Sequence, residues 1–158
     1  MKKNNSIYII IALISVVILA LMLLLNKKEK TEPYKPIKEL ENVKFNTDKI
    51  NIYLFWSEEC KHCKAIRKFL SNMDEDYKKL YNLYEIEISK SEENRIMLND
   101  FGRISHTDTT GVPVMFIGKE TVKGFVESMG QEIKDKIKKA YDSKDKTDYY
   151  QEYLKRNK

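Results

Sequence analysis

The fold is decided by residues 51–64, NIYLFWSEECKHCK, in which a short apolar run leads into two closely spaced cysteines. After Asn51 this run is apolar and aromatic as far as Trp56, which is typical of a buried strand. A polar Ser-Glu-Glu turn follows, and beyond the cysteines apolar residues recur at helical spacing as far as Met73. The sequence therefore predicts a buried strand that delivers Cys60 and Cys63 to the N-terminus of a helix.

Cys60 and Cys63 are the only cysteines of the chain, and the Cys-x-x-Cys spacing suits reversible exchange between a dithiol and a disulfide. At a helix N-terminus, free backbone N–H groups and the helix dipole stabilise a thiolate. We therefore expect Cys60 to be the nucleophile and Cys63, one helical turn later, to be the resolving thiol.

Residues 7–25 form an uncharged, strongly apolar stretch of nineteen residues. At about 1.5 Å per residue, a helix of this length matches the hydrocarbon core of a bilayer. The stretch is longer than the apolar region of a signal peptide, and no small-x-small cleavage site follows Leu25. We expect residues 1–28 to be an uncleaved N-terminal anchor with a single transmembrane helix.

Two arguments on the orientation of this anchor disagree. More lysines follow the apolar stretch than precede it, and the positive-inside rule would place the rest of the chain in the cytoplasm. A tethered thiol-disulfide domain, however, has its work among exported proteins, where disulfides form and persist. We expect a single-pass cell-membrane protein whose catalytic domain is extracytoplasmic.

The rest of the chain divides into three parts. Residues 29–42 are charged and contain Pro33 and Pro36, which indicates a tether. Residues 43–141 are expected to fold as one α/β domain of order β-α-β-α-β-β-α, a mixed central sheet flanked by helices. Residues 142–158 are expected to be a charged C-terminal tail. The expected strands cover 51–56, 80–88, 112–117 and 121–125, and helices are expected at 61–73, at 91–101 with a stop at Gly102, and at 132–141.

An ordered set of four features resembles the thioredoxin-like superfamily over residues 43–141. These features are Phe55-Trp56 with the cysteine pair, Gly111-Val112-Pro113 at the head of a hairpin, Lys123-Gly124-Phe125, and a closing helix. The resemblance implies a thioredoxin fold in which Pro113 is cis and lies against the cysteine pair. It also implies that the backbone of Val112 pairs with an extended substrate segment. Trp56 is the other residue that we expect to touch substrate.

The chain departs from thioredoxin around the cysteines. A histidine before the second cysteine, here His62, is similar to protein disulfide isomerase and DsbA-type oxidases. His62 would stabilise the Cys60 thiolate and so make the disulfide a stronger oxidant. Leu54 stands where thioredoxin has a buried aspartate that moves a proton, and the negative charges of Glu58 and Glu59 oppose His62. The sequence thus supports thiol-disulfide exchange and leaves its direction open.

Other interpretations of the cysteine pair remain open. The cysteines could be structural or simply buried, or they could bind Cu(I) in a metallochaperone. A zinc site needs about four ligands, and only His62 and His106 could complete one. Within redox chemistry, the alternative is a reductase dedicated to one exported client.

The remaining features predict which partners the chain has. The net charge of +5 is spread over interleaved Lys and Glu, which argues against a nucleic-acid site, and no nucleotide-binding glycine motif is present. We expect no cofactor and no metal. The expected partners are cysteine-containing exported proteins and an unidentified electron donor or acceptor.

Overall fold

The structure, a computed structural model, describes residues 5–25, 37–45 and 48–156, and the chain forms two compact units, 1–34 and 35–158. In the first unit a single helix, α1 (Asn5–Leu25), covers the expected membrane span. Its side chains from Tyr8 to Leu19 are exposed. Within the described ranges, no helix is both long and apolar enough to cross a membrane. The rest of the expected anchor and most of the expected tether, residues 1–4 and 26–36, lie outside the described residues.

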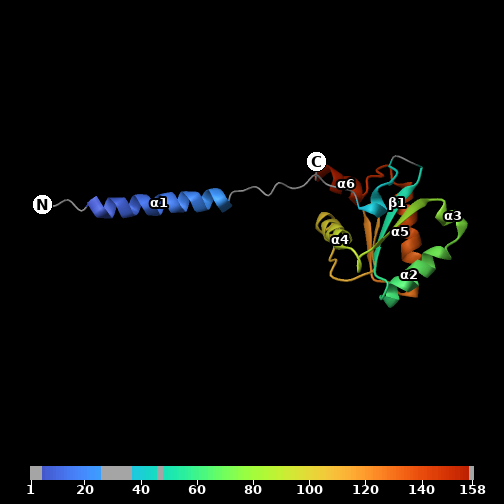
Figure 1. Ribbon diagram of the computed structural model, residues 1–158. Coiled ribbons are helices and arrows are strands. Elements are labelled where there is room, and N and C mark those ends of the chain that lie inside the picture. Colours follow the sequence, from blue (N-terminus) through green and yellow to red (C-terminus); the bar gives the residue numbers. More distant parts are fainter. Residues whose placement is uncertain (1–4, 26–36, 46–47, 157–158) are drawn as a thin grey trace. The chain divides into compact units, whose positions relative to one another are not determined.

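The second unit is built on a mixed sheet of four strands in the order β2-β1-β3-β4 (Figure 1). The central strand β1 (Ile50–Trp56) runs parallel to β2 (Tyr81–Glu87) and antiparallel to β3 (Val114–Ile117). A hairpin joins β3 to β4 (Glu120–Lys123). Because β1 has a neighbour on each side, the strand that leads to Cys60 is central and buried.

Helices cover both faces of this sheet, with α2 and α5 on one side and α4 and α6 on the other (Figure 1). The predicted α/β class with a mixed sheet flanked by helices is therefore confirmed. The helices are α2 (Lys61–Ser71), α3 (Glu75–Lys78), α4 (Glu92–Ser105), α5 (Gly130–Asp142) and α6 (Tyr149–Arg156), with short 3-10 turns η1 (Lys38–Leu40) and η2 (Glu127–Met129).

The side chains of β1 alternate between the two faces of the sheet and contribute to a hydrophobic core on each face. Ile52 and Leu54, both fully buried, belong to an aliphatic core with residues of α2 and α5. Tyr53 and Phe55 point the other way, because successive side chains of a strand alternate between its faces. There they pack edge-on against Phe101 of α4. The cysteine pair follows a strand that is anchored on both sides.

Helix α4 does not stop at Gly102, as the sequence analysis expected, but continues to Ser105. It ends at His106, which has the left-handed conformation (φ 55°). The glycine is needed for close packing instead. A Cβ atom at position 102 would lie 2.7 Å from the Thr109 side chain and 2.9 Å from the Thr107 carbonyl oxygen.

The folded unit extends beyond both expected limits of the domain, 43 and 141. At its start, Ile37 and Leu40 of the expected tether are buried. At its end, the expected charged tail forms α6, which packs against α4 and buries Tyr150 and Tyr153. Residues 142–156 therefore belong to the folded unit and contribute buried side chains to it.

Asp148 fixes α6 to the sheet. Its carboxylate accepts hydrogen bonds from the Tyr53 hydroxyl (2.9 Å), the Asn51 side-chain amide (3.1 Å) and the Gln151 backbone N–H (2.8 Å). Only 2 % of Asp148 is exposed, and this burial raises the pKa of its carboxyl. Burial, together with the charge of Asp148, raises the pKa of the Tyr53 hydroxyl. The start of β1 and the N-terminus of α6 thus share one buried polar group.

Candidate redox site

Cys60 lies at the junction between β1 and α2 and caps the helix. Its backbone is extended (φ −82°, ψ 115°), and its N–H donates to the Ser57 carbonyl (3.2 Å), which closes the turn after β1. Cys60 and Cys63 form a disulfide, with their Cα atoms 5.1 Å apart. The expected delivery of the cysteine pair to a helix N-terminus is confirmed.

The surroundings of the Cys60 sulfur suit a thiolate. The backbone N–H of Cys63 points at Cys60 Sγ from 3.1 Å, and the first turn of α2 carries no acidic residue. A hydrogen bond and the positive end of a helix both favour a negatively charged sulfur. This arrangement suits Cys60 as a thiolate leaving group from a mixed disulfide with a partner.

The two sulfurs differ in accessibility. Cys60 is partly exposed, whereas Cys63 has no exposed surface. A partner thiolate must reach a sulfur atom before it can displace its neighbour. Attack is therefore directed to Cys60, and Cys63 is placed to react only within the chain.

Val112 and Pro113 lie beside the cysteine pair, as the resemblance implies. The Val112 carbonyl oxygen is 3.4 Å from Cys60 Sγ, although the two residues are 52 positions apart. The Val112–Pro113 peptide bond is cis. The Pro113 carbonyl accepts from the Gly124 N–H (2.8 Å), so the loops before β3 and after β4 are joined next to the site.

His62 is exposed on the first turn of α2, and its Nδ1 lies 2.9 Å from the Phe125 carbonyl oxygen. A carbonyl can only accept, so Nδ1 carries the proton in this contact. The imidazole is thereby tied to the loop after β4. The sequence analysis had no signal for Phe125 as this partner, because the contact is made by a backbone atom.

We expect a His62→Asn variant to have a more negative reduction potential. From the sequence we expect the imidazole to stabilise the Cys60 thiolate, so its loss should lower the potential; a tenfold change in the exchange equilibrium corresponds to a fall of about 30 mV. Equilibration with glutathione buffers measures the potential. His106→Asn is the matched control, because His106 is also exposed but lies at the end of α4. Equal potentials for wild type and His62→Asn would remove His62 from the redox site.

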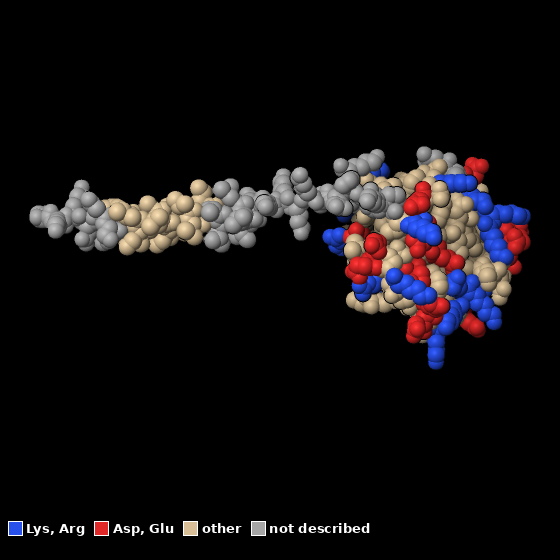
Figure 2. Space-filling view, in the orientation of Figure 1, with Lys and Arg blue, Asp and Glu red and all other residues tan. Residues whose placement is uncertain are grey.

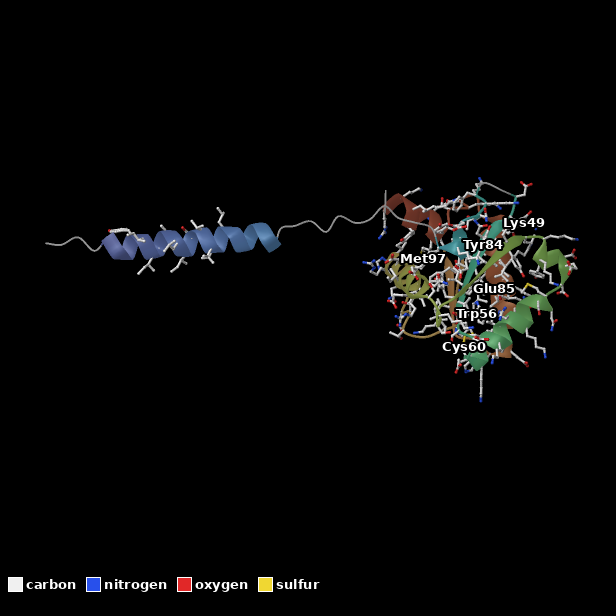
Figure 3. The ribbon with its side chains drawn as sticks, viewed as in Figure 1. Lys49, Trp56, Cys60, Tyr84, Glu85 and Met97 are labelled. Carbon is white, nitrogen blue, oxygen red and sulfur yellow. A yellow bond between two sulfur atoms is a disulfide. The ribbon has the colours of Figure 1, made fainter. Side chains whose placement is uncertain are left out.

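Trp56 lies at the end of β1 near Cys60 (Figure 3), but one face of its ring is covered. The Arg67 guanidinium stacks 3.9 Å from the ring centroid, and its Nε donates to Glu85 on β2 (2.6 Å). The Trp56 indole N–H is buried and has no hydrogen-bond partner among the described residues. Only the rest of the indole surface is left for the substrate contact that the sequence analysis expected.

The charges expected to oppose His62 are partly neutralised. Glu58 pairs with Lys90, which holds the pKa of that carboxyl below its usual value. Glu58 is thus a poor proton acceptor for the site. Leu54, at the position of the thioredoxin aspartate, is completely buried in the aliphatic core.

The described part of the chain offers no further metal ligands beside the cysteine pair. There, no group of three or more His, Cys, Asp or Glu residues is placed to hold a metal ion. His106 is exposed at the end of α4.

Comparison of the chain with protein families and with curated proteins finds no match to either. The fold and the disulfide-forming pair are compatible with a thioredoxin-like protein. Any assignment of function therefore depends on the chemistry of the site.

Proposed function

We propose that this chain is a thiol-disulfide oxidoreductase of the thioredoxin-like type. The observation that carries the proposal is the asymmetry of the pair. A partly exposed Cys60 accepts the Cys63 N–H at 3.1 Å, while Cys63 itself is fully buried. One sulfur is thus accessible and stabilised as a thiolate, and the other is sheltered for the intramolecular step.

In the oxidising direction, a client thiolate attacks Cys60 Sγ. A bond forms between the client sulfur and Cys60, the Cys60–Cys63 bond breaks, and Cys63 leaves with the electron pair and takes up a proton. A second client thiolate then attacks the client sulfur of the mixed disulfide and displaces Cys60 as a thiolate. The client loses two electrons and two protons in total, and the pair gains both electrons as a dithiol.

The same steps run backwards when a reduced pair opens a client disulfide, and a disulfide or dithiol partner of matching potential resets the pair. The Val112 carbonyl beside Cys60 supports this reaction in either direction. It lies at 3.4 Å, where it can accept a hydrogen bond from the thiol of a reduced Cys60 or from an N–H of an extended client segment.

The competing proposal, a Cu(I) metallochaperone, is less well supported. Two-coordinate Cu(I) would bind both thiolates and then pass to another protein. With Cys63 fully buried, the metal would be hard to transfer from that sulfur. Exchange through Cys60 alone needs no such access.

The reduction potential tests the proposal and gives its direction. We would equilibrate the full-length chain, in uncharged detergent, with glutathione buffers and trap its thiols. A value above about −180 mV favours an oxidase or isomerase, and one below about −230 mV favours a reductase that keeps one exported client's thiols open. A pair that never forms an intramolecular disulfide would overturn the redox proposal.

We also propose that residues 7–25 hold the domain at the outer side of the cell membrane, where it would meet cysteine-containing exported proteins. The support comes from the sequence, because this stretch has no charge over nineteen residues. Protease treatment of intact cells should digest the domain. A domain that stays uncut until the cells are lysed would place it inside.

A further inference from the structure

A cavity of about 340 Å³ opens in the folded unit far from the cysteine pair. Figure 3 shows this separation, because Lys49 from its wall and Cys60 lie at opposite ends of the unit. We call it the basic cavity. Its wall includes four lysines and two side-chain amides, namely Lys44, Lys49, Lys144, Lys146, Asn51 and Gln151.

None of the described residues that line the basic cavity carries a carboxylate. Among the described residues, no Asp or Glu lies within ion-pair distance of the Lys44 or Lys144 ammonium group. Lys146 donates to the Tyr141 carbonyl (2.6 Å) and lies over the Tyr141 ring. The wall therefore gathers several lysines, and at Lys44 and Lys144 no described carboxylate is close enough to balance the charge.

Two carboxylates that neighbour wall residues in the sequence, Asp145 and Asp148, are engaged elsewhere. Asp145 pairs with Lys119 (3.2 Å) and accepts the Thr147 N–H (2.9 Å); these contacts lower the pKa of its carboxyl to about 2. Asp148 is buried behind Asn51 and bonded to Tyr53. This contrasts with the visible face in Figure 2, where acidic and basic side chains are intermingled.

The wall is also held in place by a buried group. The Asn51 side-chain amide donates both to the Lys44 carbonyl (3.0 Å) and to Asp148 (3.1 Å). It therefore joins the segment that carries Lys44 to the segment that follows Lys144 and Lys146. A fixed arrangement of cations lowers the entropy that a ligand must lose to bind.

We propose that the basic cavity binds a phosphate group, taken either from a free phosphate or from the headgroup of an anionic lipid. Lysines bind phosphate as point charges, and the amide of Gln151 adds a neutral donor. A dianion here would reduce the mutual repulsion of the lysines. The two sources share this chemistry, and the experiment separates them.

The experiment compares the rates at which individual lysines of the full-length chain are acetylated, measured by mass spectrometry. One arm adds inorganic phosphate against chloride of equal ionic strength. The other arm compares vesicles of phosphatidylcholine alone with vesicles that contain phosphatidylglycerol. Lys68 and Lys155 are the internal controls, since both are exposed, lie outside the basic cavity and are not in a described ion pair.

We expect at least a 5-fold slower acetylation of Lys44 and Lys144 in one of the arms, with Lys68 and Lys155 unchanged. Protection by inorganic phosphate identifies a free ligand, and protection only by phosphatidylglycerol identifies a lipid headgroup. Equal slowing of all four lysines, or no slowing in either arm, would overturn the proposal.

Variants give a second measurement. About a 5-fold loss of affinity per lysine predicts that the K44Q/K144Q double variant binds the protecting anion about 25-fold more weakly. The K68Q/K155Q variant, which removes the same charge elsewhere, should bind as the wild type does. Equal affinities of the two double variants would show that only the overall charge matters.

Discussion

We expect Cys60→Ala to abolish disulfide exchange and Cys63→Ala to leave covalent complexes with client proteins. These are the results expected if Cys60 is the sulfur that partners attack. Cys63 is completely buried, so a chain that retains only Cys63 presents no reactive sulfur. A chain that retains only Cys60 can form a mixed disulfide but has no second thiol to release it.

The measurement is non-reducing electrophoresis of each full-length variant after acid trapping in its native cells, together with turnover of a disulfide substrate. Activity of Cys60→Ala should be at background, a loss of several orders of magnitude. The Cys60→Ala, Cys63→Ala double variant is the control for complexes that do not involve this pair. Trapping by Cys60→Ala instead of Cys63→Ala would reverse the assigned roles.

Asp148→Ala is expected to destabilise the folded unit by about 3 kcal/mol. The change removes the cap of α6, worth about 1 kcal/mol. It also leaves the buried Tyr53 hydroxyl and one Asn51 donor without their acceptor, at roughly 1–3 kcal/mol for each group left unsatisfied. Such a loss is a large part of the total stability of a domain of this size. Urea unfolding followed by circular dichroism measures it.

Asp148→Asn is the matched variant, because its one oxygen can still accept the Gln151 N–H at the helix cap while its amide can donate to the Tyr53 hydroxyl oxygen. Burial raises the pKa of Asp148 in the folded state above its unfolded value of 3.8. Its contribution is therefore fully present below that pH and is lost as the pH rises through the folded pKa. The wild type should lose stability relative to Asp148→Asn as the pH rises above about 4 and through the folded pKa of Asp148. If the wild type instead gained stability relative to Asp148→Asn as the pH rises, the hydrogen bonds to the carboxylate would stabilise its charged form more than burial destabilises it.

The elements around the cysteine pair were predictable, because their signals are local. The apolar run of β1, the polar turn and the helical spacing after Cys63 all lie within residues 51–73. The second strand, expected at 80–88, covers Tyr81–Glu87. Periodicity and turn residues define such elements without knowledge of the rest of the fold.

The docking of α6 was missed because charge dominates residues 142–158. Its apolar signal is weak but present, since Tyr149, Tyr150 and Tyr153 fall on neighbouring helical positions after Asp148, a favoured N-cap residue. Only the aromatic face of the sheet, where Tyr150 packs against Tyr53, makes burial of this helix favourable. The end of α4 was predicted wrongly at Gly102 for a related reason. A glycine that permits close packing has the same letter as one that ends a helix.

The contacts that complete the candidate site could not be read from the sequence. The Phe125 carbonyl at His62 and the Arg67 guanidinium over Trp56 both depend on how distant segments are brought together. Neither pair has a sequence signature. The residues that carry the chemistry were predictable from their types and spacing, but the groups that orient them were not.

The stacking of Arg67 on Trp56 also gives the chain a built-in optical reporter. Trp56 is the only tryptophan, so all intrinsic indole emission comes from the junction between β1 and α2. With one ring face under a guanidinium and the indole nitrogen buried, collisional quenchers such as iodide have little access. The tryptophan fluorescence of the unlabelled protein should therefore change if α2, with the cysteines at its start, moves relative to β1 when a client is added.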